Sequence, residues 1–261
     1  MNRLRIVFKY IKYLITAQSK YAIQSPFLYE LATKVIYKKK IDSVCQSINN
    51  LREELSQSEK VIEITDFGAG SSINNSKKRK IKDIARNSAK NSKFGELIYR
   101  LIKFYKPKNI IELGTSLGVS TSYLARANND SKVFTFEGCP ETSKIAKKNF
   151  DKQKINNTCI TIGDFDLTLA KSLKEIKHID LAFIDGNHQE KATINYFEEC
   201  LIYSNNNTIF IFDDIHWSVG MERAWEYIKN HKKTTLTVNL FFIGIVFVKS
   251  ELSKQNFTIR F

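Results

Sequence analysis

The spacing of apolar residues changes near Pro107 and then follows one rule for about a hundred residues. Short apolar runs alternate there with stretches whose apolar positions recur as on one face of a helix. Strands alternating with helices predict βαβ units, a parallel sheet and right-handed crossovers. The runs are "NIIEL", "KVFTF", "CITIG", "IDLAFID" and "TIFIFDD".

The end of the chain breaks this alternation. "TTLTVNLF" and "IGIVFVK" have strand character, and too few residues separate them for a helix. They predict an antiparallel hairpin at the sheet edge. We therefore expect an α/β fold, with a Rossmann-like, doubly wound sheet of seven strands. That sheet is mostly parallel and ends in an antiparallel hairpin strand.

The residues before this sheet have a helical pattern. In 3–17, Leu4, Phe8, Ile11 and Ile15 share one helix face. Ser25-Pro26 is a typical helix start, and 42–56 and 93–106 are further expected helices. We expect a helical cap over 1–92 and a Rossmann-like domain over 93–261.

Composition narrows the classes of protein. The 261 residues are 43% hydrophobic, enough for one substantial core. The four cysteines lack zinc-site spacing, which favours reduced thiols and a cytoplasmic location. We see no secretory leader and no run of about 20 apolar residues that would span a membrane. The net charge of +14 comes from scattered basic residues, which favours a solvated lysine-rich surface over a nucleic-acid site.

One early motif invites a wrong assignment. "VIEITDFGAGSS" (61–72) contains the D-F-G tripeptide of protein kinases. A kinase needs a glycine-rich loop, a strand lysine and H-R-D upstream, but the first histidine is His178. We interpret this segment as a tight turn in the cap. The alternative is a cap loop whose Asp66 faces a cleft built by other residues.

In an open α/β sheet, ligands bind beyond the carboxyl ends of the strands. The first strand leads into "ELGTSLGVS", where Gly114 and Gly118 permit a sharp turn before a helix N-terminus. Glu112 is placed to accept an ammonium group. Glu137 ends the second strand 23 residues after Gly114 and is placed to bind two ribose hydroxyls. Asp164, after the third strand, is placed to accept from an adenine amine.

This set resembles the class I S-adenosylmethionine-dependent methyltransferases over about 93–250. The resemblance implies S-adenosylmethionine as cofactor. "SKFGELIYRL" resembles the helix that passes over that cofactor, with Gly95 at the close approach. The implied cofactor-binding residues are Glu112, Gly114, Thr115, Gly118, Ser120, Glu137, Gly138, Asp164, Phe165 and Asp185.

The same loop also fits G-x-S-x-G, the nucleophile elbow of α/β-hydrolases. Ser116 would be the nucleophile, followed in the right chain order by Asp185 or Asp213 and then His216. A hydrolase elbow follows several earlier strands, whereas the upstream region here has a helical pattern. This serine-hydrolase alternative is therefore disfavoured.

The last two parallel strands end in "AFIDGNHQEK" and "FIFDDIHWS". These ends resemble metal-dependent small-molecule O-methyltransferases of the catechol, caffeoyl-coenzyme A and macrolide-sugar types. The resemblance implies Mg²⁺ held by Asp185, Asp213 and Asp214. Three converging carboxylates repel one another unless a hard cation joins them.

Two histidines are candidates for proton transfer. Catechol-type enzymes have a lysine base three residues after the strand-four aspartate, and His188 stands at that position here. Imidazole suits general-base work near neutral pH. His216 follows the acidic pair and is a candidate base, ligand or supporting group. The expected catalytic residues are His188, His216 and Asp185.

The favoured function is O-methylation of a small-molecule hydroxyl, with divalent-metal assistance. Motifs in both parts also resemble uncharacterised Bacteroidetes-type bacterial methyltransferases, which name no acceptor. One alternative is a nucleic-acid (RNA) methyltransferase, disfavoured because "DGNH" replaces the D-P-P-Y of base-amine enzymes. Another is a non-catalytic, membrane-associated protein, since helix 3–17 is basic and amphipathic. We expect that helix to dock on its own domain or form a homodimer contact more often than a peripheral membrane contact.

Overall fold

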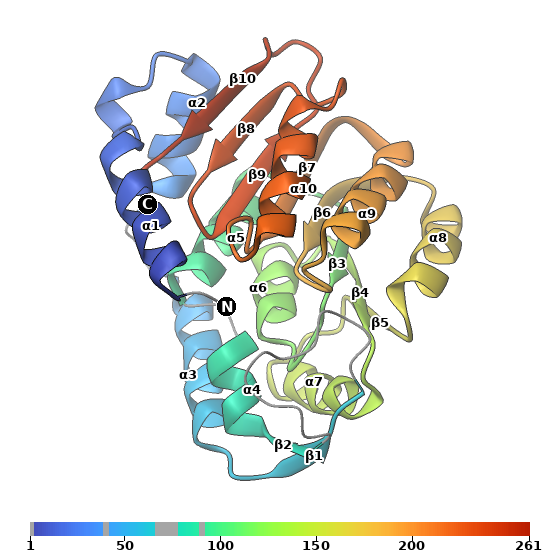
Figure 1. Ribbon diagram of the computed structural model, residues 1–261. Helices are drawn as coiled ribbons and strands as arrows, with labels where there is room; N and C mark the ends of the chain where they lie inside the picture. The colour runs from blue at the N-terminus through green and yellow to red at the C-terminus, as the bar shows by residue number, and fades with distance from the viewer. Residues whose placement is uncertain (1–2, 39–41, 66–77, 89–91) are drawn as a thin grey trace. The chain divides into compact units, whose positions relative to one another are not determined.

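The computed structural model describes residues 3–38, 42–65, 78–88 and 92–261 (Figure 1). The chain forms two compact units: a terminal unit, Met1–Lys38 with Lys177–Phe261, and a central unit, Lys39–Ile176. The expected cap over 1–92 does not coincide with either unit, because its helices divide between the two. The "DFGAGSS" segment lies outside the described residues.

The central unit holds the first three parallel strands. Their register pairs Ile110 with Val133, and Val133 with Thr158. Helices connect the strands, as the alternating pattern predicts. The strands are β3 (Asn109–Leu113), β4 (Lys132–Glu137) and β5 (Thr158–Ile162), and the helices that follow them are α6 (Val119–Ala127), α7 (Pro140–Lys152) and α8 (Phe165–Ile176).

Three more helices belong to this unit: α3 (Ser43–Gln57), α4 (Ile81–Ser88) and α5 (Ser92–Tyr105). Ile48 and Leu51 of α3 pack in one apolar cluster with Tyr123 of α6. A short antiparallel pair, β1 (Val61–Glu63) and β2 (Lys78–Lys80), lies beside α4. The sequence pattern does not predict this pair, because three-residue strands are too short to show alternation.

The terminal unit holds the other strands, in the order β10-β8-β9-β7-β6. β6 (Ile179–Ile184) runs parallel to β7 (Ser204–Asp213), and β7 pairs antiparallel with β9 (Ile243–Phe247). β9 and β8 (Leu236–Asn239) are antiparallel neighbours, which confirms the expected hairpin. Its expected place at the sheet edge is wrong, because β10 pairs with the outer side of β8. Helix α9 (Glu190–Ile202) connects β6 to β7, and helix α10 (Val219–Asn230) connects β7 to the hairpin.

β10 (Gln255–Thr258) is an additional strand beyond the seven that the pattern predicts. It runs parallel to β8, with Gln255 opposite Leu236. Its sequence, "QNFT", is polar and short. Its strand conformation therefore comes from pairing with a distant segment and not from local propensity.

The N-terminal helices of the terminal unit begin with α1 (Arg3–Thr16) and α2 (Pro26–Leu31), joined by the 3₁₀ turn η1 (Lys20–Ala22) and followed by the π-helical turn η2 (Ala32–Ile36). The predicted helix start at Ser25-Pro26 is confirmed: the Ser25 hydroxyl accepts from the Leu28 N–H at 3.4 Å. Among the described residues, no helix has both the length and the apolar character needed to cross a membrane.

Candidate active site

The glycine loop after β3 has a backbone that only certain residues tolerate. Gly114 has φ +105° and Gly118 has φ +80°. A Cβ on Gly118 would lie 2.6 Å from the Phe150 ring. Ser116 adopts φ +48° between them, an uncommon conformation for a residue with a side chain. The loop thus enters α6 through a turn that brings backbone N–H groups to the helix N-terminus.

Glu137, the acid at the end of β4, lies against this loop. Its carboxylate accepts from the backbone N–H of Ser116 at 2.7 Å and of Cys139 at 2.9 Å. The backbone N–H of Gly114 in turn donates to the Phe136 carbonyl at 3.0 Å. The structure therefore brings together the two features that the sequence places 23 residues apart. Gly138 lies between Glu137 and Cys139 in this hydrogen-bonded turn.

Glu112 forms hydrogen bonds with buried hydroxyl groups of the protein interior. It is fully buried, and its carboxylate accepts from the hydroxyls of Thr121 at 2.5 Å and Thr135 at 2.6 Å. The Thr115 hydroxyl joins the Thr135 hydroxyl at 2.5 Å. This network ties the loop, β4 and α6 together beneath the turn. Ser120 is also buried, in the first turn of α6.

Asp164 stands at the start of α8. Its carboxylate accepts from the Asp166 N–H at 3.0 Å, and its carbonyl accepts from Thr168 N–H at 3.0 Å. This is the geometry of a helix N-cap. Gly163 before it has φ +140°. Phe165 is the first residue of α8 and is half-buried.

Gly95 makes its close approach to a side chain of its own unit. A Cβ at this position would lie 2.3 Å from the Tyr123 ring. The glycine therefore lets α5 and α6 pack together, whereas the resemblance implies that it makes room for a cofactor.

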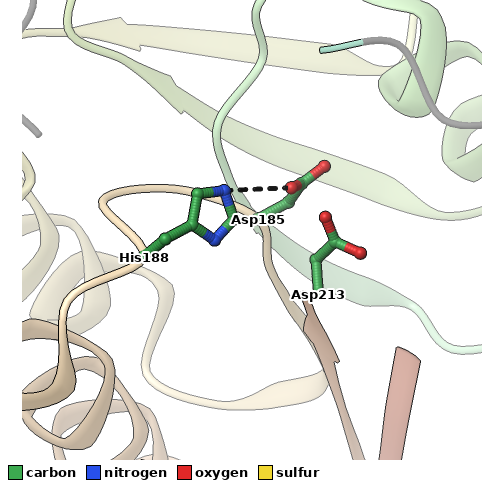
Figure 2. A group of neighbouring side chains, drawn as sticks. All are labelled: Asp185, His188 and Asp213. Atoms are coloured by element: carbon green, nitrogen blue, oxygen red, sulfur yellow. Dashed lines mark ion pairs between the residues drawn. The ribbon is translucent and has the colours of Figure 1, made fainter. Parts of the chain in front are cut away.

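The terminal unit carries the second group of candidate residues. Asp185 follows β6 directly and Asp213 ends β7; the two strands are parallel neighbours, with Ile184 opposite Phe212. His188 completes the group: one ligand atom from each of the three side chains lies within 4.8 Å of the others. Figure 2 shows His188 reaching back from its loop toward Asp185, with the Asp213 carboxylate beside them.

The cluster combines a buried carboxylate with a loop whose backbone has positive φ angles. Asp213 is only 1% exposed, and His188 Nε2 lies 3.8 Å from Asp185 Oδ1, an ion-pair distance when the imidazole is protonated. Asn187 has φ +63° and His188 φ +23°. The Asn187 amide donates to the Tyr196 hydroxyl of α9 at 3.1 Å. The loop that carries His188 is thus held in a strained backbone by α9, a contact that no sequence signal indicates.

Asp214 lies outside the cluster that the described residues form. It has φ +52°, and its carbonyl accepts from the Trp217 N–H at 2.9 Å. Asp213 is the last residue of β7, and Asp214 begins the turn that follows it.

His216 is held by groups outside the cluster. Its Nδ1 lies 3.3 Å from Glu222, and its Nε2 lies 3.1 Å from the Asn239 amide. An amide N–H donating to Nε2 places the imidazole proton on Nδ1, facing Glu222. Burial lowers the pKa of His216, and Glu222 offsets this only in part. With both ring nitrogens engaged inside the terminal unit, neither is left to activate a serine.

Known proteins resemble this chain in sequence and in fold. Residues 111–215 match the family model described as a methyltransferase domain. A catechol O-methyltransferase of Niastella koreensis is 29% identical over 124 residues, which are 46% of this chain. The match spans 55% of that relative, about half its length.

Solved structures extend the likeness to most of the fold. The O-methyltransferase TomG of Streptomyces achromogenes, in complex with S-adenosylmethionine, superposes with a TM-score of 0.57 at 17% identity, over 85% of this chain and 95% of that one. An O-methyltransferase of Bacillus cereus, in complex with S-adenosylhomocysteine, gives 0.54 at 19% identity, over 83% and 94%. The chain thus has the fold of O-methyltransferases of known structure, and its residues 111–215 match the methyltransferase domain family.

Proposed function

We propose that this protein is an S-adenosylmethionine-dependent methyltransferase that methylates a hydroxyl group of a small molecule with the help of a divalent cation. The observation that carries the proposal is the cluster of Asp185, His188 and Asp213 at the ends of two parallel strands, inside the segment that matches a methyltransferase domain.

The central unit supplies the cofactor half of the proposal. The α6 N-terminus and the loop N–H groups suit the carboxylate end of the cofactor. Glu137 is assigned to the ribose hydroxyls, and Asp164 with Phe165 to the adenine. Glu112 faces inward to two threonines, so we assign it to positioning the loop. The remaining assignments are Gly114, Thr115, Gly118, Ser120 and Gly138, whose backbone shapes the turn.

The residues of the cluster fit a divalent cation. Ligand atoms at about 2.1 Å from Mg²⁺ span at most ~4.2 Å across an octahedron. In the structure, one ligand atom of each of the three side chains lies within 4.8 Å of the others, close to that span. A bound cation would polarise the acceptor hydroxyl and lower its pKa. Asp185 and Asp213 would supply oxygen ligands. Asp214, the third ligand that the sequence predicts, lies outside the cluster, and the proposal does not depend on it.

His188 is assigned as the general base. A bound S-adenosylmethionine would supply the methyl group, whose bond to sulfur would break as its bond to the acceptor oxygen forms, leaving a neutral thioether. His188 would take up the hydroxyl proton. A nitrogen ligand would favour Zn²⁺ or Fe²⁺ over Mg²⁺, so the preferred cation reports whether His188 is base or ligand. His216 is assigned to holding the loop after β7.

The proposal extends to partners and location. The acceptor is a small molecule and not a nucleic acid, because "DGNH" replaces the motif of base-amine enzymes. All four cysteines are free thiols, which fits a reducing cytoplasm. For α1, the proposal includes a homodimer contact as the alternative to docking on its own unit.

Calorimetric titration with S-adenosylhomocysteine tests the proposal, first alone and then with Mg²⁺, Mn²⁺ or Zn²⁺ and a catechol-like acceptor. We expect micromolar binding of the thioether and acceptor binding that depends on the cation. Folded protein that binds no S-adenosylhomocysteine would contradict the cofactor assignment. Acceptor binding or turnover that is unchanged by chelator would remove the metal and leave His188 as base alone.

A further inference from the structure

Helix α1 is fixed to the terminal unit by one of its faces. The Tyr13 hydroxyl donates to the Ile259 carbonyl at 2.5 Å, and the Tyr10 and Tyr13 rings lie 4.9 Å and 5.3 Å from the Phe241 ring. Tyr13 and Ala17 are buried with Phe241 in one apolar cluster. The helix therefore docks on its own unit, as the sequence favours.

The opposite face of α1 is also apolar, and it faces solvent. This outward face contains the residues whose spacing first indicated an amphipathic helix. They are neither polar nor covered by any described part of the chain, and each is exposed: Leu4, Val7, Phe8, Ile11 and Ile15. A helix that is apolar on both sides and buried on only one leaves a surface that another apolar medium can cover.

The charged residues near this face indicate what kind of surface it can contact. Residues 1–29 contain no aspartate or glutamate, and their basic residues are Arg3, Arg5, Lys9, Lys12 and Lys20. Arg5 and Lys9 form ion pairs with Glu222 of α10. Lys12 is exposed one turn after Phe8 on the same side of the helix. The single Glu222 carboxylate offsets only part of this charge. A second copy would bring two such net positive segments together, whereas an anionic surface complements them.

A tyrosine beyond the end of α1 is also exposed to solvent. Tyr21 is 85% exposed, and Lys20 Nζ lies 4.9 Å from its ring centroid. An aromatic ring paired with a cation is typical of side chains at the boundary between lipid and water.

We propose that the outward face of α1 docks on a membrane surface that contains anionic phospholipid. The helix has 14 residues and is about 21 Å long, too short to cross a bilayer. It lies in the plane of the surface, with its apolar side chains among the acyl chains and its lysines at the headgroups. Since Glu222 contacts both α1 and His216, the docked helix is linked to the loop after β7.

Flotation of the full chain with vesicles tests this surface. We use phosphatidylcholine vesicles with and without phosphatidylglycerol, at low and at high salt. We expect binding only to the anionic vesicles, weakened by salt. The double variant Phe8→Glu and Ile15→Glu should bind at least ~10-fold more weakly, because both side chains leave the lipid and two negative charges are added.

A matched control lies on other helices. Leu167 and Ile202 are 77% and 74% exposed, against 71% for Phe8 and 76% for Ile15. The double variant Leu167→Glu and Ile202→Glu should float as the wild type does. Circular dichroism and binding of S-adenosylhomocysteine monitor folding of both variants, and neither readout uses turnover.

Three outcomes would overturn the proposal. The first is wild-type protein that stays with the soluble fraction at low salt. The second is a loss of flotation as large in the control pair as in the α1 pair. The third is a dimer in sedimentation velocity that the α1 substitutions dissociate, without vesicle binding by the wild type, which would assign the face to a second copy.

Discussion

At the scale of single residues, three candidate carboxylates, two in the central unit and one in the terminal unit, have three different environments. Glu137 accepts from two backbone N–H groups, Glu112 accepts from two buried hydroxyls, and Asp185 lies in a cluster with His188 and Asp213. Only the last combines acids with an imidazole, so only this one suits a cation. We therefore assign the three carboxylates different roles: Glu137 in orienting a ligand, Glu112 in positioning a loop and Asp185 in binding a metal.

Replacing Glu137 tests the proposal that it binds the cofactor. Glu137→Gln keeps one acceptor for the loop but removes the charge that a ribose would meet. We expect the dissociation constant of S-adenosylhomocysteine to rise ~10-fold to 100-fold, because hydrogen bonds to a charged group contribute about 1.5–3 kcal/mol. Calorimetry measures it, with Glu141→Gln on the adjacent helix as control. Unchanged affinity would show that Glu137 does not contact the cofactor.

Replacing Asp185 tests the proposal that it binds a divalent cation. Asp185→Asn should weaken Mn²⁺ binding, followed by electron paramagnetic resonance, by ~10-fold to 100-fold. Turnover should fall with it, while the affinity for S-adenosylhomocysteine stays near that of the wild type. Asp180→Asn, on the same strand β6, is the matched control. Equal Mn²⁺ binding by both variants would contradict the assignment of Asp185 as a ligand.

At the scale of elements, the junction between β3 and α6 places the proposed cofactor site. The positive φ values at Gly114, Ser116 and Gly118 turn the chain sharply, and the Glu112 network fastens the turn from below. The two glycines adopt these angles without a Cβ clash, whereas at Ser116 the conformation costs on the order of 1–3 kcal/mol. Phe150 of α7 fills the space beside Gly118.

Gly118→Ala should destabilise the protein by roughly 1–3 kcal/mol, because the added Cβ meets the Phe150 ring and φ stays positive. Gly220→Ala in α10 is the matched control, since the nearest neighbour of its Cβ would be the Glu190 Cβ of α9, at an ordinary contact distance of 3.4 Å. That substitution should leave stability unchanged or raise it by about 0.5–1 kcal/mol. Chemical denaturation compares the two, and equal free energies of unfolding would contradict the packing argument.

At the scale of the whole chain, the two ends of the sequence share the terminal unit. The backbone N–H groups of Gln18 and Arg260 donate to Thr258 and Gln18 carbonyls at 2.8 Å and 3.0 Å. Glu222 adds an electrostatic link, since it pairs with Arg5, Lys9 and His216. The first helix and the last strand are therefore stabilised together.

This link should depend on pH. Burial by itself would raise the pKa of Glu222, but Lys9, Arg5 and His216 together lower it. A carboxyl with a lowered folded-state pKa stabilises the protein above its unfolded value of about 4.5, and this contribution is lost as pH falls through the folded-state pKa. Glu222→Gln should thus be less stable than wild type at neutral pH and equally stable in acid.

Unfolding by guanidinium at a series of pH values measures this difference. Glu226→Gln is the matched control on α10, because Glu226 is more exposed and pairs only with its own helix at Lys229 and Asn230. A gap between wild type and Glu222→Gln that stays constant from neutral to acid pH would contradict the proposed ion-pair link.

Local patterns were enough to predict most elements. Apolar runs and helical spacing are properties of neighbouring residues, so β3 to β9, the helices between them and the cap at Ser25 follow from the sequence. The rule that ligands bind beyond the carboxyl ends of parallel strands likewise predicts which loops carry the candidate residues. Asp185 and Asp213 meet because β6 and β7 are parallel neighbours.

Other features depend on residues far apart in the sequence, and only the tertiary structure decided them. β10 forms because β8 offers its edge, Glu112 turns inward because Thr121 and Thr135 lie within reach, and His216 is held by Asn239 and Glu222. The periodicity of α1 identifies a helix but not which side is buried. Both sides are apolar, so the choice was made by the docking of Tyr13 against Phe241 and Ile259, contacts that no local pattern encodes.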